Sequence, residues 1–360
     1  MTTNLQGGGA EKAVLALARG LARRGHEAHV ILLEDVMQHP AAEEARVHAL
    51  TKPGVRSGKG WFGKRASALA LRRLIRRLGD GHPFDLVVST LPYCDEVVAL
   101  SGIEPVWFRV ANTLSVEIEL LGRNSRSRAG RRHARYRRLY GASNVIAVSD
   151  GVARDLTQTL GLTSANVVRI YNPIDREELG GLAARPEPRL PKEPYLIHAG
   201  RFAPQKRHDL LLEALRRSGL SHRLVLLVPP SAALERLIAA SGVADRVTIA
   251  GFQPNPYPWI ARAELLVLCS DHEGMPNVLA EALACGTRVV STDCPSGPRE
   301  LLRDSLARFL VPCGDAQALA TAMRDALAAP RPLPPAVLEE FQPERVFAQY
   351  EALPRMRRGT

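Results

Sequence analysis

The strongest constraint on the fold is an alternation of amphipathic helices with short apolar strands, which runs through the chain twice. In the first series, helices are predicted over 10–24 and 65–78, and strands over 26–33, 84–90, 105–110 and 144–149. In the second series, strands are predicted over 195–200, 223–228, 247–252, 265–270 and 288–293, with helices between them. Short apolar strands that alternate with helices are typical of a parallel sheet covered on both faces. The sequence therefore predicts an α/β protein with two such sheets.

A segment rich in Pro, Gly and charge separates the two series. It reads GGLAARPEPRLPKEP over 180–194, a composition that favours a linker. A length of 360 residues also suits two domains better than one. Four parts are expected: an N-terminal domain over 1–175, a linker over 176–194, a second domain over 195–335, and a closing helix over 336–360.

Cysteine usage and hydropathy place the chain in the cytoplasm. The five cysteines are odd in number, scattered and without a CxxC pair, so a disulfide framework and a zinc site are not expected. No stretch approaches the roughly 18 apolar residues that cross a bilayer, and no secretion signal opens the sequence. We expect a soluble cytoplasmic protein.

The segment CSDHEGMPNVLAEALACG, residues 269–286, carries the clearest chemical signal. A predicted strand ends at Ser270, and a helix begins after Pro276 and ends near Gly286. Open α/β sheets bind ligands beyond the carboxyl ends of their strands, where free amides at a helix start attract phosphate. Glu273 precedes the helix and Glu281 lies inside it. One carboxylate can therefore reach a sugar while the other reaches a ribose; the alternative is an ordinary capped helix.

Two further loops fit an anionic ligand. GRFAPQKR follows the strand at 195–199, where Gly200 permits a tight turn and Arg201 and Lys206 can neutralise a departing diphosphate. QGGGAEK, residues 6–12, opens the first helix with glycines that let amides approach a ligand, but it matches neither a Walker motif nor GxGxxG. No D-x-D triplet occurs, so no metal is expected.

These motifs together resemble the family 4 glycosyltransferases of the GT-B fold, over almost the whole chain. The most specific part is E-x7-E, Glu273 to Glu281, with EGMPN between. GGGAE, YNPID (171–175), GRFAPQK and STDCPSGPREL (291–301) occur in the family's order. The last segment is most similar to the branch that builds lipid-linked oligosaccharides, O-antigens and capsules.

The resemblance implies two facing Rossmann-like domains with a cleft between them, and an enzyme that retains anomeric configuration without metal or cofactor. The donor would be a nucleotide-diphosphate sugar, UDP-linked, and the acceptor a lipid-linked or saccharide molecule that binds the N-terminal domain. The residues implied for donor binding and catalysis are Gly8, Gly9, Asn112, Gly200, Arg201, Lys206, Gly251, Phe252, Glu273, Gly274, Met275, Pro276, Asn277, Val278 and Glu281.

Two departures from the family pattern concern the first domain. Relatives place a histidine after the strand that corresponds to 105–110, whereas this chain has RVANTLS, so Asn112 or Arg109 is the expected polar partner of the donor sugar. Relatives also have an apolar strand before the glycine loop, whereas this chain begins MTTNLQGGG. The central first strand is therefore expected to be missing, and the natural start to lie upstream of Met1.

Positive charge is concentrated in the first half of the chain. Of a net charge of +11, residues 1–185 contribute +9, from 27 Lys and Arg against 18 Asp and Glu. The segment RNSRSRAGRRHARYRR, 123–138, holds eight arginines and no acid. At helical spacing one face is formed by Arg128, Arg131 or Arg132, Arg135 and Arg138.

An anionic membrane surface is the partner that we expect for this face, on the inner side of the cytoplasmic membrane, because each basic residue near such a surface contributes roughly 1 kcal/mol. A solvated basic face is the alternative. Nucleic acid is not expected, since aromatic residues are almost absent from the segment. A non-catalytic nucleotide-sugar or nucleic-acid binding protein on the same fold remains the alternative function.

Overall fold

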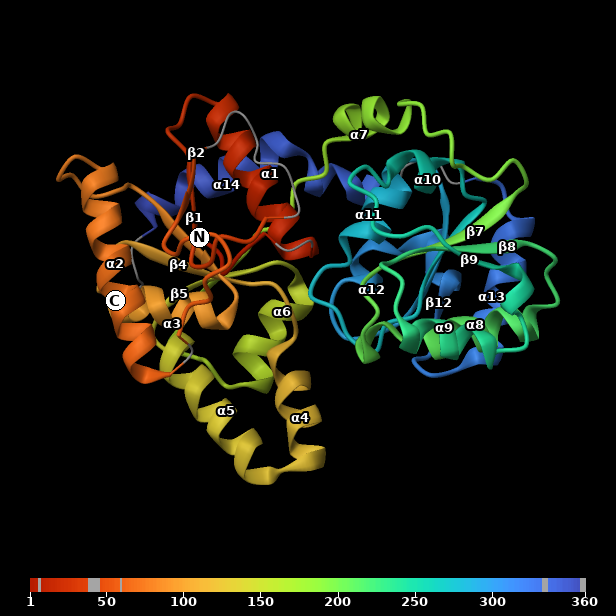
Figure 1. The fold of residues 1–360 in the computed structure, drawn as a ribbon, viewed down its shortest axis with the longest axis horizontal. Coiled ribbons are helices and arrows are strands. Elements are labelled where there is room, and N and C mark those ends of the chain that lie inside the picture. Colours follow the sequence, from red (N-terminus) through yellow and green to blue (C-terminus); the bar gives the residue numbers. More distant parts are fainter. Residues whose placement is uncertain (6–7, 38–45, 59, 332–335, 357–360) are drawn as a thin grey trace. The chain divides into compact units, whose positions relative to one another are not determined.

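The computed structural model describes residues 1–5, 8–37, 46–58, 60–331 and 336–356 (Figure 1). The chain forms two compact units: Met1–Pro173 with Pro343–Thr360, and Ile174–Gln342. Part of the glycine loop (6–7), the end of the expected second domain (332–335) and the last four residues (357–360) lie outside the described residues.

The second unit contains one parallel sheet. Its strands are β7 (Tyr195–Ala199), β8 (Arg223–Leu227), β9 (Val247–Ile249), β10 (Leu265–Leu268), β11 (Arg288–Thr292) and β12 (Leu310–Val311). They lie in the order β12-β11-β10-β7-β8-β9, with every neighbouring pair parallel. This is the strand order of a Rossmann sheet, in which the direction of winding reverses between the first and fourth strands. Here those strands are β7 and β10, so the loops after them lie at the switch point.

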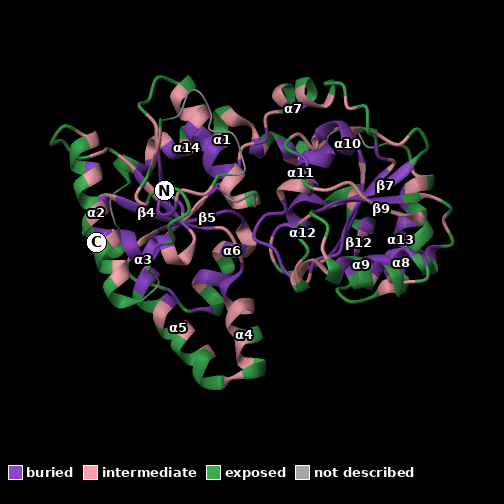
Figure 2. Ribbon diagram, viewed as in Figure 1, coloured by how far each residue is buried: buried purple, intermediate pink, exposed green. Residues whose placement is uncertain are grey.

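Among the residues described in this unit, seven α-helices accompany the sheet. They are α7 (Arg176–Ala183), α8 (His208–Ser218), α9 (Ala232–Ala239), α10 (Tyr257–Arg262), α11 (Asn277–Ala284), α12 (Pro298–Leu301) and α13 (Ala316–Ala328), with 3-10 turns at Pro204–Lys206, Ala244–Arg246, Asp304–Phe309 and Ala336–Phe341. α8 packs beside α13, and Leu211, Leu215, Val267 and Met323 share one core. Buried residues follow the strands and exposed ones the outer sides of the helices (Figure 2).

The segment expected as a linker, 176–194, is partly helical. Asp175 caps α7 by accepting a hydrogen bond from the amide of Glu178. α7 packs against α10, and Asn255 Nδ2 donates to the carbonyl of Leu182 at 2.9 Å. The helix therefore belongs to the second unit, and the Pro-rich stretch begins only after it. The interpretation of this stretch as linker overlooked the capping residue and the acids that favour a helix start.

The first unit has two parallel sheets rather than one. β1 (His29–Leu32) pairs with β2 (Arg46–Ala49), and a four-stranded sheet follows the order β3 (Val87–Thr90), β4 (Val106–Val110), β5 (Asn144–Ala147) and β6 (Asn166–Arg169).

Residues Met1–Leu5 lie between these two sheets without forming a strand. The amide of Thr2 donates to Ile31 and the amide of Thr90 donates to the carbonyl of Met1, at 3.1 and 3.0 Å. Where the structure describes the chain, two isolated bridges, Thr2 with Leu32 and Leu5 with Met37, continue the pairing. A cavity of about 700 Å³ adjoins them, lined by residues of both sheets.

The helices of the first unit are α1 (Gly9–Arg23), α2 (Trp61–Leu78), α3 (Pro92–Ser101), α4 (Leu114–Asn124), α5 (Arg126–Tyr140), α6 (Asp150–Arg154) and α14 (Pro343–Ala352), with a π turn at Asp155–Thr159 and a 3-10 turn at Leu353–Arg355. α1 packs on α14, and a Cβ at Gly20 would lie 1.9 Å from the Phe347 ring. Arg24 holds Glu351 through two hydrogen bonds of 2.7 Å. The last helix of the chain thus completes the first unit.

Candidate functional site

Two loops meet at the switch point of the second unit. The loop after β7 carries Gln205 and Arg207, and the loop after β10 carries Asp271 and His272. The amide of Asp271 donates to the carbonyl of Gln205 at 2.9 Å, while Gln205 Nε2 donates to the carbonyl of His272 at 2.5 Å. Arg207 adds an ion pair to Asp271 at 3.0 Å. These backbone and side-chain contacts fix the two loops against each other.

Glu273 lies at the centre of this junction. Its residue is only 7 % exposed, and its Oε1 accepts hydrogen bonds from Lys206 Nζ and Ser270 Oγ, both at 2.6 Å. The sequence predicted that Glu273 and Lys206 serve one ligand, and the fold brings them together. The ion pair also places the lysine on the carboxylate, so an anion at Lys206 would share or displace that contact.

Helix α11 starts directly after this loop and carries the second carboxylate. Asn277 and Val278 lie in its first turn, after Gly274, Met275 and Pro276. Glu281 is buried, and Tyr257 Oη donates to its Oε1 at 3.2 Å. Burial and the neighbouring Glu281 raise the pKa of Tyr257, so the phenol stays protonated and orients the carboxylate.

A third loop, after β11, supports the first two. Thr292 Oγ1 donates to the carbonyl of Ser270 at 2.6 Å, and the amide of Glu273 donates to the carbonyl of Pro295 at 3.3 Å. Gly297 has φ +95°, and a Cβ there would lie 2.3 Å from Pro276 Cδ. Only glycine suits both the conformation and the space, so this residue sets how closely the supporting loop approaches α11.

Beneath the loop after β7, which carries Arg201 and Lys206, two neutral histidines pack edge to face. The rings of His198 and His208 are 4.8 Å apart, and His198 Nδ1 lies 2.9 Å from the carbonyl of Val267. Burial lowers the pKa of His198 to about 3 and that of His208 to about 4. Above them Gly200 is close-packed, since its Cβ position lies 3.3 Å from His198 Nε2. Arg201 is exposed and has no acidic partner within the described part of the chain.

The remaining predicted residues lie farther apart. Gly251 (φ +79°) and Phe252 follow β9. Gly8 caps α1 and Gly9 begins it, in the first unit.

Asn112 follows β4, and its Oδ1 accepts from the amide of Thr113 at 3.0 Å. Arg109 is 1 % exposed and donates to Thr90 and Asn172, so it serves the interior of the first unit. Asn112 is therefore the more accessible of the two candidates.

No cluster of three or more His, Cys, Asp and Glu side chains suited to a metal ion occurs among the described residues. Cys269 adjoins the site, but burial raises its pKa to about 12, so it is not a thiolate ligand.

The arginine face of the first unit is smaller than predicted. Ser125 divides the segment, so that Arg123 lies in the last turn of α4 and α5 begins at Arg126. Arg132 pairs with Glu117, and Arg135 Nε lies 2.5 Å from Glu96. Arg128, Arg131 and Arg138 are exposed. The prediction of a single face over Arg128–Arg138 was wrong for Arg132 and Arg135, because acids distant in sequence turn them inward. In the described parts of the chain, no helix is long and apolar enough to cross a membrane.

Four supporting residues were not predicted. Ser270 and Tyr257 hold the two carboxylates, Gly297 supports the loop, and His198 lies under Gly200. Ser270 and Gly297 belong to segments that the sequence analysis had already identified, so their positions could have indicated their roles. The sequence around Tyr257 and His198 gives no such indication, because their roles depend on contacts between separate strands and helices.

Two family models match most of this chain. Residues 7–178 match a family described as Glycosyltransferase Family 4, and residues 193–329 match one described as Glycosyl transferases group 1. The chain is 29 % identical over 313 residues to a Campylobacter jejuni N-acetylgalactosaminyltransferase whose substrate is a diphospho-undecaprenol saccharide, covering 86 % of this chain and 84 % of the relative. It is 27 % identical to the Escherichia coli lipopolysaccharide 1,6-galactosyltransferase, over 60 % of this chain and 62 % of the relative.

Solved structures show the same fold. Sucrose-phosphate synthase from Thermosynechococcus elongatus matches with a TM-score of 0.76 at 18 % identity, covering 98 % of this chain and 94 % of that one. HepE from Anabaena, in complex with UDP and glucose, matches with a TM-score of 0.70 at 18 % identity, over 99 % of both chains.

Proposed function

This chain belongs to the family 4 glycosyltransferases of the GT-B fold, and on that premise we propose that it moves a hexose or N-acetylhexosamine from a UDP-linked donor to a lipid-linked or saccharide acceptor. The transfer retains anomeric configuration and needs no metal or cofactor. It serves the synthesis of a cell-surface polysaccharide or glycolipid. The C. jejuni and E. coli relatives, named for N-acetylgalactosamine and galactose transfer, support this choice of donors and acceptors.

The observation that carries the proposal is the arrangement of Glu273, Lys206 and Glu281 around the start of α11. The amides of Gly274, Met275 and Asn277 can receive the donor, with Glu273 on sugar hydroxyls and Glu281 on the ribose. Arg201 and Lys206 lie on the loop that faces this segment, where two cations suit a diphosphate.

In the reaction, the bond from the anomeric carbon to the diphosphate oxygen breaks, and an acceptor hydroxyl oxygen bonds to that carbon. The hydroxyl proton passes to an oxygen of the departing diphosphate. Negative charge on the leaving group grows as the bond breaks, so Arg201 and Lys206 stabilise the transition state more than the bound donor. The Lys206 contact with Glu273 orients the ammonium before the donor binds.

We place the enzyme in the cytoplasm, at the inner face of the membrane. The excess of +9 in residues 1–185 and the exposed arginines Arg128, Arg131 and Arg138 support this location. A lipid-linked acceptor would be reached from that surface.

A panel of nucleotide sugars tests the proposal in two steps. A donor at ~100 times its dissociation constant adds about 2.7 kcal/mol of stability, so the true donor should raise the unfolding temperature most. Radiolabelled sugar from that donor should then reach a polyprenyl-diphosphate saccharide, with unchanged rate in EDTA. Stabilisation without transfer or hydrolysis would favour a non-catalytic binding protein, and loss of rate in EDTA that magnesium or manganese restores would contradict metal independence.

A further inference from the structure

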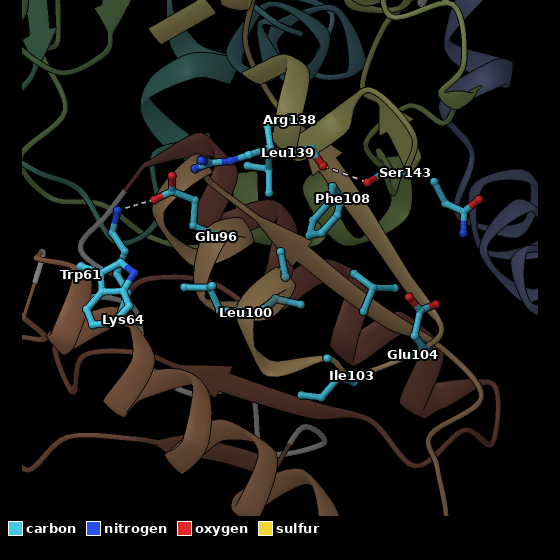
Figure 3. A pocket seen from close by; sticks show the side chains of 15 residues that line it. Trp61, Lys64, Glu96, Leu100, Ile103, Glu104, Phe108, Arg138, Leu139 and Ser143 are labelled. Carbon is cyan, nitrogen blue, oxygen red and sulfur yellow. Dashed lines mark hydrogen bonds and ion pairs between the residues drawn. The ribbon is translucent and has the colours of Figure 1, made fainter. Parts of the chain in front are cut away.

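A second cavity lies in the first unit, away from the residues assigned to the reaction. It has a volume of about 630 Å³ and is lined from α2, α3, α5 and the first residues of β4 and β5, Val106 and Asn144 (Figure 3). It therefore opens at the amino ends of these parallel strands. Open α/β sheets take their substrates at the carboxyl ends, so a ligand of this cavity would lie apart from the substrates.

About half of the lining is apolar. Leu100, Ile103 and Phe108 contribute side chains, and Phe108 is buried while Leu100 is 47 % exposed. Hydrocarbon surface that is removed from water here would stabilise a bound chain by about 25 cal/mol per Å². The cavity can thus hold an alkyl chain.

One end of the cavity is cationic. Glu96 already faces two cations, since Lys64 Nζ and Arg135 Nε each lie 2.5 Å from its carboxylate. Arg138 lines the same end in Figure 3 and, among the described residues, has no acidic partner. Glu104 lies at the opposite end, as the same view shows. Three cations against one carboxylate leave a positive end that suits a phosphate group.

The rim continues onto the surface of helix α2. Trp61 lines the cavity and is 57 % exposed, and Phe62 beside it is 80 % exposed. Arg65 lies over the Trp61 ring at 4.1 Å. α2 contains no acidic residue, and it also exposes Arg72, Arg73, Arg76 and Arg77. Exposed aromatics with arginines and no acids are typical of helices that lie in the headgroup region of an anionic bilayer.

We propose that this cavity binds one anionic phospholipid of the membrane, with its phosphate at Arg138 and Lys64 and an acyl chain along Leu100, Ile103 and Phe108, while Trp61 and Phe62 enter the bilayer interface. The site extends the membrane location proposed above but needs no particular donor or acceptor. A polyprenyl diphosphate has similar chemistry, and the position at the amino ends of the strands favours the phospholipid.

Binding of a monomeric lipid separates a cavity from a merely basic surface. Dihexanoyl phosphatidylglycerol, kept below its micelle concentration, should bind the full chain saturably at one site in calorimetry, and the phosphatidylcholine analogue at least tenfold more weakly. Arg138→Gln should weaken phosphatidylglycerol binding about tenfold. Arg131→Gln, an exposed arginine on the same helix outside the cavity, should change it less than twofold. Absence of saturable binding, or equal losses in both variants, would overturn the site.

Two further variants separate the chain site from the interface. Leu100→Gln should weaken binding of the monomeric lipid several-fold, and Leu69→Gln on α2 should not. Phe62→Ala should leave monomeric binding intact but reduce cosedimentation with phosphatidylglycerol vesicles at least threefold. Stronger competition by undecaprenyl phosphate than by phosphatidylglycerol would assign the cavity to the polyprenyl carrier and reject the phospholipid.

A fold control keeps this test independent of the proposed reaction. Each variant should retain the wild-type stabilisation by UDP, which binds the second unit. If UDP stabilised no form of the protein, the proposed donor site would fail while the lipid result would stand.

Discussion

At the scale of single residues, the contact between Glu273 and Lys206 joins structure to function. Both side chains are mostly buried, and Ser270 supplies the carboxylate with a second hydrogen bond. Removing one partner of a buried ion pair typically lowers the free energy of unfolding by roughly 3–5 kcal/mol, because the other charge is left unpaired. An alanine variant at either residue would therefore lower both the stability and the turnover rate, and the two effects could not be separated. Glutamine, which keeps a hydrogen-bonding oxygen, is the better probe.

We expect different losses at the two carboxylates. Glu273→Gln should lower turnover about 100-fold, because it weakens the contacts to sugar and lysine, and should change UDP affinity by less than about threefold. Glu281→Gln should weaken UDP about tenfold, or ~1.4 kcal/mol, through a poorer hydrogen bond to ribose. Steady-state kinetics and calorimetry measure both, with Glu235→Gln on the exposed face of α9 as control. Equal, small effects would contradict the assignment.

Gly297 gives a second prediction at this scale. Gly297→Ala should lower both stability and turnover, because its methyl group would overlap Pro276 and push the supporting loop from α11. Gly314→Ala is the matched control: Gly314 has φ +78° but open space around it. In Gly314→Ala the free energy of unfolding should decrease by only about 1 kcal/mol, because alanine disfavours positive φ, and turnover should not change. Thermal unfolding and initial rates distinguish the two, and equal losses would show that crowding at Pro276 is unimportant.

At the scale of helices and strands, the sequence predicted the second unit well. All five strands that it indicated there occur, within a few residues. Parallel strands buried on both faces, such as β7 and β10, give uninterrupted apolar runs. β2, β6 and β12 escaped prediction, since β2 has exposed ends, β6 is only half-buried and β12 has only two residues. The carboxylates and cations of the site were predictable from loop position. Their partners were not, because Tyr257 reaches Glu281 from a separate helix.

The histidines of β7 and α8 predict loss of stability in acid. Their pKa values of about 3 and 4 lie below the ordinary 6.5, so the unfolded chain binds more protons as pH falls below 6.5. The free energy of unfolding therefore has its highest value above that pH and decreases toward pH 4. At pH 5 the decrease is about 2 kcal/mol per histidine. His208→Leu should remove about half of the shift in unfolding temperature between pH 7 and 5. His82→Leu, at an exposed histidine, should leave the shift unchanged, and an undiminished shift in His208→Leu would contradict this origin.

At the scale of the whole molecule, charge is divided unevenly along the chain. The first 185 residues hold +9 of the net +11. Arg132 and Arg135 form ion pairs within the first unit, so the charge available to a membrane comes from residues such as Arg128 and Arg131. Such attraction acts over ~10 Å at 0.1 M salt and weakens as salt rises.

Charge reversal tests this attraction. Arg128→Glu with Arg131→Glu should weaken binding to phosphatidylglycerol vesicles at least tenfold, since each basic residue contributes about 1 kcal/mol. Arg185→Glu with Arg236→Glu, exposed arginines of the second unit, is the control of equal charge and should bind nearly as wild type. Cosedimentation over a salt series provides the measurement. Equal losses in both pairs would show that net charge alone governs binding.

The divided sheet of the first unit has a consequence for the order in which that unit opens. Within the described residues, the hydrogen bonds that join β1 and β2 to the other four strands pass through Met1–Leu5, beside a cavity of about 700 Å³. Segments with few buried contacts open locally at a lower free energy than the rest of a domain. Amide hydrogens of His29–Leu32 and Arg46–Ala49 should therefore exchange with deuterium well before those of β4 and β5, which mass spectrometry of peptides would resolve. The reverse order would mean that α1, packed on α14, holds the small sheet as firmly as strand pairing would.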